Sequence, residues 1–554
     1  MRGSALVLTL SAVLSLPACG SEDKRRLLDQ PKRGGTLTVL QAGASENRTL
    51  DPAQAFPGLF TLSVYRTLYR ERTGGRAPIP DLAESAPEIA ADGRSLTVRL
   101  RPGVRFAPPV GREVTAADVE HAIERAFLAS VGSSSALAFL GDLEGAEPGA
   151  RAPAPDIPGV EATDDRTLVL RFTRPAAGAA AAALVLPLTA PVPPEVAVPL
   201  DREKVSDYGR TPVATGPYMP QANTPGRGVR LVRNPNWSAA TDTRNAFVDA
   251  IEVREGYTDP TTVGRLVLDG SHRISEIAPL PPAIVRRAPS TALHIVPRAV
   301  LALALNTTRP PFDDVRVRRA VASAIDRSVF QQVSGGPRAA GLATHFLHPG
   351  VPGFDEAGGT AGPQPAHLAA PDGDVEGARR RLTEAGVDPA KTRLDVVSFQ
   401  GAFEEYTDLV EAQLEEVGFK LRVVRASPEV ALTKLCGRPV TRYHACLSVI
   451  ESDVADAQAL LSPTYEGRQI QPTFNRNVSQ LADPEVDRLI AAATETAAAQ
   501  ARAVAWAKVD RALVDLVPAV PLLWANDQAL ASPDVGDLRS PLTGIADPTS
   551  MWLR

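Results

Sequence analysis

The segment from Asp92 to Phe127 constrains the fold more than any other part of this chain. Polar and apolar residues alternate over Ser95–Leu100, and this period of two predicts a strand with one buried face. A turn follows at Arg101-Pro102-Gly103, and Thr115 and Asp118 then have the spacing of a helix N-cap with its capping box. The helix itself is predicted by an apolar stripe at Val119, Ala122, Ile123, Ala126 and Phe127. Local chemistry alone therefore predicts a strand, a turn, a loop and a helix in this order.

Two further segments carry helix signals. Residues Val64–Arg70 are expected to form a helix that leads into a linker. Residues Leu301–Leu305 alternate as a strand, and Asp313 or Asp314 can cap the helix that follows it. The basic residues of that second helix fall mostly opposite its apolar stripe, and we expect them on a solvated face: Arg316, Arg318 and Arg319.

A βαβ unit is predicted near the middle of the second half of the chain. Its first strand is Leu394–Phe399, its helix is Glu404–Val417 with a stop at Gly418, and its second strand starts at Phe419. The crossover of such a unit is expected to be right-handed. Further on, Asp483-Pro484 is an N-cap followed by proline at the first helical position, which predicts the start of another helix.

The N-terminus is typical of an exported protein. The apolar run Ala5–Leu16 is too short to span a bilayer and has the length of a signal-peptide core. Leu16-Pro17-Ala18-Cys19 resembles a bacterial lipobox, so we expect residues 1–18 to be removed and Cys19 to carry a lipid. The polar residues 19–33 would then be a solvated tether. An ordinary secretory peptide with an incidental cysteine is the alternative.

Length and composition exclude several classes of protein. A chain of 554 residues is too long for one ordinary core, so two or three domains are expected. The formal net charge of −5 indicates neither nucleic acid nor an acidic surface as a partner. The 50 prolines and 41 glycines indicate many loops, while the 44% hydrophobic content indicates a globular chain.

Two pairs of residues could bind metal or serve the fold. Cys436 and Cys446 are ten residues apart in a chain that we expect to be exported, and oxidising surroundings favour a disulfide between them. A metal pair is the weaker interpretation, because no other ligand accompanies them. His345 and His348 are spaced three apart, but Pro349-Gly350 indicates a loop and no third ligand is evident, so we expect no metal there.

Wording as well as periodicity carries information about the family. The run DG…LTVRLRPGVRF…VTAADV between Asp92 and Val119 resembles the signature region of the family 5 extracellular solute-binding proteins of bacterial ABC importers. Other blocks resemble this family in the same order. They are Leu50-Asp51-Pro52, Val213–Tyr218, Val229–Trp237, Thr261–Gly270 and Val517–Trp524. The resemblance runs from Gly34 to Trp524.

The resemblance implies a two-lobed α/β fold of the periplasmic-binding-protein type (class II, cluster C) with an extra domain in the first lobe. Lobe 1 would hold residues 34–72, 206–297 and 526–554; the extra domain would hold 73–205; and lobe 2 would hold 298–525. The hinge strands would lie near residues 298–306 and 522–527. A ligand buried between the lobes would favour their closure.

The resemblance also implies a site for the α-amino group of a peptide. In peptide-binding members an aspartate of lobe 2 meets that group, since a buried ammonium needs a carboxylate partner. Asp453 falls at that position, while Ile450 stands where an aromatic residue is common. Asp456 could take the same role or cap the following helix. A helix cap or a surface charge is also the alternative for Asp453.

Four further residues are weaker candidates for the ligand site. Glu46 resembles a first-lobe cleft residue of oligopeptide binders, against a solvated loop charge as the alternative. Ser452 and Gln400 could line the cleft at strand ends. Asn306 follows a buried strand at the hinge, where its side chain could touch the solute or hold local backbone.

The implied function is that of a receptor. It would be an extracytoplasmic, lipid-anchored monomer that captures a peptide-like solute and delivers it to an ABC import permease, with no cofactor and no metal. No bond of the solute is broken, so no catalytic group is needed, and the chain has neither a Gly-x-Ser-x-Gly nor a His-Glu-x-x-His motif of hydrolases. Two alternatives stay open: a receptor for a metal chelate, haem-like molecule or oligosaccharide, and a sensor lipoprotein without transport.

Overall fold

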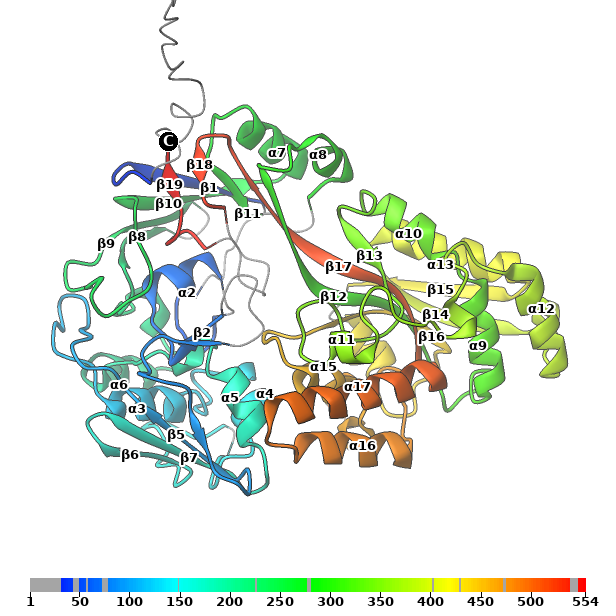
Figure 1. The fold of residues 1–554 in the computed structure, drawn as a ribbon, viewed down its shortest axis with the longest axis horizontal. Coiled ribbons are helices and arrows are strands. Elements are labelled where there is room, and N and C mark those ends of the chain that lie inside the picture. Colours follow the sequence, from blue (N-terminus) through cyan, green and yellow to red (C-terminus); the bar gives the residue numbers. More distant parts are fainter. Residues whose placement is uncertain are drawn as a thin grey trace, which may run out of the picture.

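Two lobes joined by two long strands make up the molecule (Figure 1). The computed structural model describes residues 31–42, 49–55, 58–71, 78–147, 149–224, 227–276, 280–400, 403–427, 430–471, 475–538 and 547–554. Glu46 and Cys19 lie outside these residues. Among the helices of these ranges, none is long and apolar enough to cross a membrane.

One mixed sheet runs through both lobes in the order β15-β14-β16-β12-β17-β11-β1-β10-β9-β8, and β13 pairs with β17. The long strands β12 (Leu293–Leu305) and β17 (Ala519–Ala531) form its centre. The lobe 1 strands are β1 (Thr36–Ala42), β8 (Tyr218–Thr224), β9 (Gly228–Arg233), β10 (Ala250–Tyr257) and β11 (Ile274–Glu276). The lobe 2 strands are β13 (Ala340–Leu342), β14 (Arg393–Phe399), β15 (Lys420–Ala426) and β16 (Ala445–Glu451).

The central pair of strands changes register where it passes from one lobe to the other. Pro297 of β12 lies opposite Asn526 of β17, and Ala299 lies opposite Ala525, so Arg298 is the extra residue of a β-bulge. β11 flanks β17 near Leu530 on the lobe 1 side, and β16 flanks β12 from Ala299 onward on the lobe 2 side. Because bulges bend a strand and increase its twist, the sheet turns at the point where the lobes meet.

Lobe 2 contains the predicted βαβ unit. β14 and β15 are parallel neighbours joined by α13 (Glu404–Val417), and Gly418 ends that helix with a φ of 116°. A left-handed residue at this position favours glycine, which explains the sequence signal. The other helices of this lobe are α9 (Val315–Ala324), α10 (Arg327–Val333), α11 (Phe354–Ala357), α12 (Val375–Glu384), α15 (Ala457–Tyr465), α16 (Pro484–Thr494) and α17 (Ala499–Leu516). Asp483 caps α16 as predicted.

The expectation for the basic residues of α9 is wrong in part. Arg316 and Arg319 are exposed, but Arg318 is buried, and its guanidinium donates to the carbonyl oxygens of Phe312 at 2.7 Å and Leu516 at 2.6 Å. The carboxyl end of α17 leaves carbonyl groups without helical partners, and a cation there is favourable. The position of α17 decides this burial, and the periodicity of α9 does not record it.

The extra domain has its own sheet and core. Its four strands, in the order β4-β5-β7-β6, are β4 (Glu88–Ile89), β5 (Ser95–Arg99), β7 (Thr167–Arg171) and β6 (Val160–Asp164). Its helices are α3 (Ala116–Arg125), α4 (Ser134–Leu140), α5 (Ala177–Ala183) and α6 (Pro194–Asp201). The predicted capping box of α3 is present, with the Thr115 amide donating to Asp118 Oδ2 at 2.8 Å.

The prediction of a helix over Val64–Arg70 is wrong. The helix α2 (Leu59–Val64) ends there, and Tyr65 already has an extended backbone. The chain then runs to β2 (Tyr69–Arg70), which pairs with β3 (Ile79–Pro80). Arg66, the residue after Tyr65, is buried in an ionic cluster, and this tertiary contact outweighs the local helix pattern.

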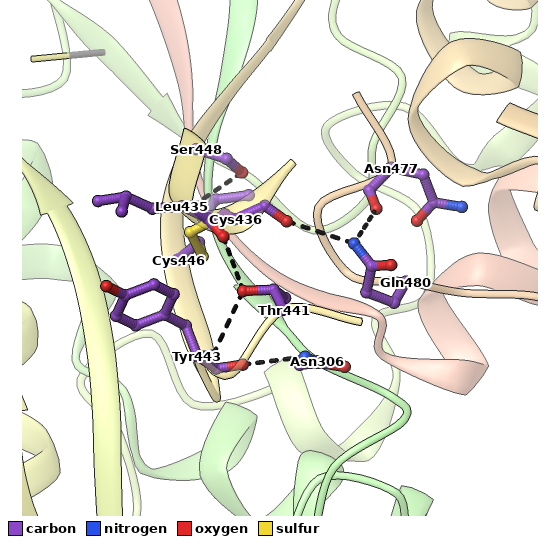
Figure 2. Close-up of a disulfide and its surroundings, with 10 residues drawn as sticks. Asn306, Leu435, Cys436, Thr441, Tyr443, Cys446, Ser448, Asn477 and Gln480 are labelled. Carbon is purple, nitrogen blue, oxygen red and sulfur yellow. Dashed lines mark hydrogen bonds between the residues drawn. A yellow bond between two sulfur atoms is a disulfide. The ribbon is translucent and has the colours of Figure 1, made fainter. Parts of the chain in front are cut away.

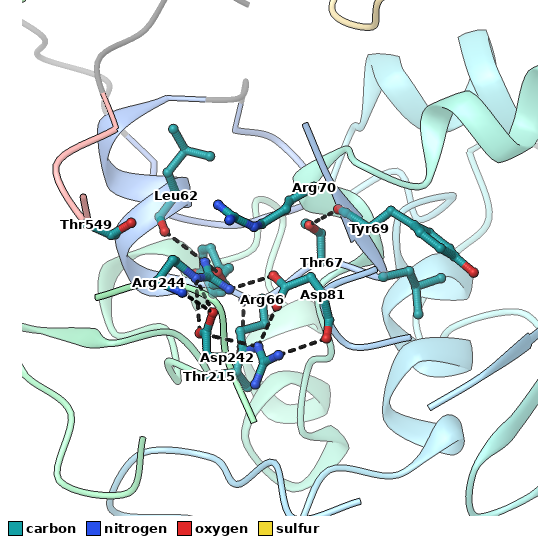
Figure 3. Close-up of polar contacts among 12 residues, drawn as sticks. Leu62, Arg66, Thr67, Tyr69, Arg70, Asp81, Thr215, Asp242, Arg244 and Thr549 are labelled. Carbon is teal, nitrogen blue, oxygen red and sulfur yellow. Dashed lines mark hydrogen bonds and ion pairs between the residues drawn. The ribbon is translucent and has the colours of Figure 1, made fainter. Parts of the chain in front are cut away.

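That ionic cluster joins the extra domain to lobe 1 (Figure 3). Arg66 Nε lies 2.7 Å from Asp81 Oδ1, and Arg244 contacts both Asp81 at 2.5 Å and Asp242 at 3.0 Å. Burial alone would raise the pKa of Asp242, but Arg244 and Arg66 hold it below its usual range. Asp81 follows β3 and Arg66 follows α2, whereas Asp242 and Arg244 come from the segment between β9 and β10.

A second buried cluster makes the same connection. Arg125 of α3 lies 2.8 Å from Asp51 of lobe 1 and 2.7 Å from Asp201 of α6, and all three side chains are almost fully buried. Two such clusters leave the extra domain and lobe 1 little freedom to move apart, because separating them would leave buried charges unpaired.

Around these contacts, lobe 1 completes its core with the chain end. α7 (Pro260–Leu268) and α8 (Pro282–Arg287) pack on Leu40 and Leu530. The final strands β18 (Val535–Gly536) and β19 (Trp552–Leu553) pair with each other, and Val535 and Met551 join the lobe 1 core.

We expect Arg125→Met to lower the free energy of unfolding by about 3–5 kcal/mol, because it leaves the buried carboxylates of Asp51 and Asp201 without a cation. Thermal unfolding followed by circular dichroism measures this effect. Arg210→Ala is the control, since the Arg210–Asp207 pair is exposed and contributes little. Equal melting temperatures for the two variants would contradict a role of Arg125 in joining the domains.

Candidate functional site

A cluster of charged residues lies at the bulge between the lobes. We call it the junction cluster, and its members are Arg298, Glu451, Asp453, Arg476 and Asp527. Arg298 Nη1 contacts Asp527 Oδ2 at 3.0 Å, and Arg298 Nε lies 3.6 Å from Glu451 Oε2. Arg476 Nη2 donates to the carbonyl oxygen of Glu451 at 2.7 Å. Both Arg298 and Arg476 act electrostatically on Asp453. Three carboxylates therefore share two guanidinium groups, which leaves one negative charge in excess.

Among the described residues, Asp453 is the member of the junction cluster whose carboxylate has no bonded partner. It is partly buried, and in the part of the chain that the structure describes its carboxylate makes no hydrogen bond or ion pair. Burial raises its pKa above the ordinary value, and Arg298 opposes that rise. A carboxylate withdrawn from water without a bonded cation is unfavourable, so it is ready to accept one from a ligand.

The neighbours of Asp453 have structural roles. Ser452 Oγ accepts a hydrogen bond from the Val454 amide at 3.3 Å. Asp456 caps α15 by accepting from the Gln458 amide at 2.9 Å, and it pairs with Arg502 at 2.5 Å. The structure thus gives Asp456 the capping role that was one of its two interpretations.

The two more distant candidates also bind local backbone. Asn306 is buried, and its Nδ2 donates to the Tyr443 carbonyl oxygen at 2.9 Å (Figure 2), while its Oδ1 accepts from the Thr308 amide at 3.0 Å. Gln400 is exposed beyond β14, and its backbone amide donates to the Ala426 carbonyl oxygen at 3.0 Å. The structure does not bring either side chain into the junction cluster.

Four members of the junction cluster were not predicted as site residues: Arg298, Glu451, Arg476 and Asp527. Glu451 stands two residues before Asp453 and could have been found by its alternation with it along the chain. The other three come from distant segments, and only the pairing of β12 with β17 and β16 brings two of them together.

A disulfide holds the start of the strand that leads to this cluster. Cys436 and Cys446 are bonded (Figure 2), which links the short π-helix Ala431–Cys436 to β16. Gln480 Nε2 donates to the Cys436 carbonyl oxygen at 3.3 Å. β16 is thereby fixed at its beginning, and its other end at Glu451 reaches the junction cluster.

Two buried histidines lie close to the same strands. The His345 ring stacks on Phe354 at 5.0 Å and meets the edge of Trp524 at 5.1 Å. Burial lowers the pKa of His345 and of His348 to about 4, and Arg298 also lowers that of His348. Both rings are therefore neutral at neutral pH. Within the described ranges, no group of three or more His, Cys, Asp or Glu residues is placed to hold a metal ion.

The histidine loop is held by a buried acid. Asp510 of α17 accepts hydrogen bonds from the amides of Phe346 at 2.9 Å and Leu347 at 3.3 Å. Its side chain is fully buried, and burial raises its pKa from 3.8 to about 7 in spite of these two donors.

Comparisons with known proteins agree with this architecture. The sequence profile of "Bacterial extracellular solute-binding proteins, family 5 Middle" matches residues 77–471. "Di/tripeptide-binding protein 2" of Pseudomonas aeruginosa (strain UCBPP-PA14) is 26% identical over 456 residues, which are 76% of this chain and 75% of that protein.

Solved structures extend the comparison over nearly the whole chain. "Clavulanic acid biosynthesis oligopeptide binding protein 2" superposes with a TM-score of 0.79 at 29% identity, covering 94% of this chain and 96% of that one. The Helicobacter pylori "ABC transporter-associated periplasmic binding protein DppA", in complex with the peptide STSA, has a TM-score of 0.73 at 18% identity. This superposition covers 96% of this chain and 100% of that one. The expected two-lobed fold is confirmed.

The titration of Asp510 gives a pH-dependent stability. Because folding raises its pKa from 3.8 to about 7, the stability that this group contributes is complete below pH 3.8 and is lost as the pH rises through 7. We expect the wild-type free energy of unfolding to fall over this window, by at most about 1.4 kcal/mol per pH unit, relative to Asp510→Asn.

The measurement is urea unfolding at several pH values between 5 and 8. The slope against pH is the readout, since the asparagine also loses one amide contact and shifts the overall level. Asp515→Asn, on the exposed side of the same helix, should keep the wild-type slope. A wild-type slope in Asp510→Asn would contradict the assignment.

Proposed function

Because the chain belongs to family 5 of the bacterial extracellular solute-binding proteins, we propose that it captures a short peptide between its lobes and delivers it to the permease of an ABC importer. The observation that carries the proposal is the unpaired carboxylate of Asp453 in the junction cluster. The printed names of its relatives, a di/tripeptide-binding protein and an oligopeptide-binding protein, support a peptide as the solute.

The charge of the junction cluster suits the amino end of a peptide. Three carboxylates and two guanidinium groups have one negative charge in excess, and one α-ammonium group balances it. The ammonium would donate charge-assisted hydrogen bonds to Asp453, which is the group without a bonded partner. Capture in this way breaks no bond in the peptide and needs no catalytic residue.

Binding at this place would favour closure of the lobes. Glu451 and Asp453 follow β16 of lobe 2, whereas Asp527 lies on β17 beyond the bulge toward lobe 1. A ligand that contacts both sides binds the closed form better than the open one, and this difference in affinity drives closure. We propose the lobe limits at residues 298 and 525, and the registers on either side of the Arg298 bulge support them.

The ammonium contact can be tested by a mutant cycle. We expect Asp453→Asn to weaken the binding of free di- and tripeptides by about 10- to 100-fold, the usual size of a lost charge-assisted hydrogen bond. N-acetylation of the peptide should weaken its binding to the wild-type protein by a similar factor. It should hardly weaken binding to the Asp453→Asn variant any further. Isothermal titration calorimetry on the soluble form that starts at Ser21 gives the four affinities.

Asp408→Asn is the matched control, because Asp408 is an exposed carboxylate of lobe 2 paired with Arg425. Independent, additive losses from acetylation and from Asp453→Asn would contradict the contact. Native mass spectrometry of wild-type protein from its own host tests the solute class. A series of peptide masses supports the proposal, and a single non-peptide mass overturns the peptide assignment.

We propose further that the protein acts outside the cytoplasm as a monomer anchored by a lipid on Cys19. Cys19→Ser should then move the protein from the membrane fraction to the soluble fraction, because the proposed lipid attachment point is lost. Cell fractionation with immunoblotting measures this, and Ser21→Ala is the control. Membrane retention of Cys19→Ser would contradict the anchor.

A further inference from the structure

The loop Ser452–Asp456, which we call the ligand loop, contacts two different bodies. Asp453 belongs to the junction cluster, where we propose that the peptide binds. The next residue, Val454, is only 4% exposed and belongs to the hydrophobic cluster that holds the core of the extra domain, with Ala177 and Ala180 of α5, and that also takes in Ala53 and Val213 of lobe 1.

A second contact holds the same loop against the extra domain. Arg502 of α17 pairs with Asp456 at 2.5 Å and donates to Gln458 Oε1 at 2.9 Å. On its other side lies α5, where a Cβ atom built on Gly178 would be 3.7 Å from Arg502 Nε. Figure 1 shows α5 beside α17, and the sequence AGAAAAA of α5 presents only small side chains to its neighbours.

We infer that the extra domain positions the ligand carboxylate: Val454 and Arg502 hold the ligand loop against α5, and Val454 is therefore a positioning residue for peptide binding. The inference rests on the proposed function, since Asp453 is taken as the peptide contact. Val454 itself touches no ligand and acts only through Asp453.

This contact joins two parts of the molecule that are expected to move relative to one another. The extra domain is tied to lobe 1 by the buried clusters of Arg66 and Arg125, while the ligand loop belongs to lobe 2. The contact of Val454 and Arg502 with the extra domain is thus a bridge between the two moving bodies, just beyond the end of β16 at Glu451. Ligand and bridge both favour the same closed arrangement, so they are expected to be coupled.

Substitutions at Gly178 test the bridge from the side of the extra domain, without touching the ligand loop. Gly178→Ala is the matched control, because its Cβ would lie at ordinary van der Waals distance from Arg502 and alanine favours the helix. Gly178→Trp places an indole where Arg502 lies and should force the two bodies apart. We expect Gly178→Trp to raise the Kd for free peptides about tenfold, mainly through faster dissociation, with Gly178→Ala unchanged.

Val454→Ala tests the bridge from the other side and keeps the inference falsifiable if Gly178→Trp does not fold. Its Kd should rise in the same direction, and Val454→Ile should restore it. The decisive readout is the ratio of the affinities for free and N-acetylated peptides, which should fall in Val454→Ala because Asp453 is no longer held in place. Loss of affinity with the wild-type ratio retained would overturn the positioning role, and so would unchanged affinity in both variants.

A ligand-free measurement separates this inference from the proposed function. Spin labels at Glu161→Cys of β6 and Lys508→Cys of α17, both exposed in the native protein, report the distance between the extra domain and lobe 2. Gly178→Trp should lengthen or broaden that distance, and no change would overturn the bridge. A wild-type protein that binds no peptide, with the bridge intact by this measurement, would instead overturn the proposed function.

Discussion

The antiparallel pairing of β12 with β17 is the interaction that the rest of the structure depends on. It extends from Leu293 opposite Leu530 to Ala304 opposite Ala519, so the same two strands are central in both lobes. Continuous hydrogen bonding makes such a ribbon resist stretching, and its bending concentrates where the ladder is interrupted. The interruption at Arg298 also places a guanidinium between Asp527 and Glu451. This bulge and the charged cluster therefore share one residue, Arg298.

Buried charges have two roles in this molecule: some join two parts of the fold, and one is proposed to contact the ligand. The two roles differ in whether the charge has a bonded partner. Arg66 and Arg125 are buried with carboxylates at hydrogen-bonding distance, and such pairs fix how two bodies fit together more than they add stability. Asp453 is also withdrawn from water, but its guanidinium neighbours act on it only at a distance. Among the described residues Asp453 thus differs from the carboxylates that hold the domains together, and this difference is the ground for proposing it as a ligand contact.

The sequence predicted those elements whose signals are local. The capping box of Thr115, the stop at Gly418 and the cap at Asp483 each depend on residues within one turn, and all three are present. Failures came where distant partners decide. Arg66 lies outside the helix and Arg318 is buried because other segments supply their acceptors, and no local pattern records those acceptors.

The candidate site was predictable in the same uneven way. Asp453 was found through its place in a family-like segment, whereas Arg298 and Asp527 could not be found without the register of β12 against β17. A bulge shifts every later residue by one position, so a strand pattern alone cannot say which side chain reaches the junction. The sequence could place the carboxylate, but it could not show that the carboxylate lacks a bonded partner.

The ligand loop explains how a small ligand could control two large bodies. Closure needs an interaction that differs between the open and closed forms, and a ligand can shift the balance only by that difference. If the bridge at Val454 contributes part of the closing free energy, the peptide has to supply only the remainder. The remainder would come from the contact with Asp453, the neighbouring residue on the same backbone. A single backbone segment that carries both contacts couples them directly, without a relay through the core of either lobe.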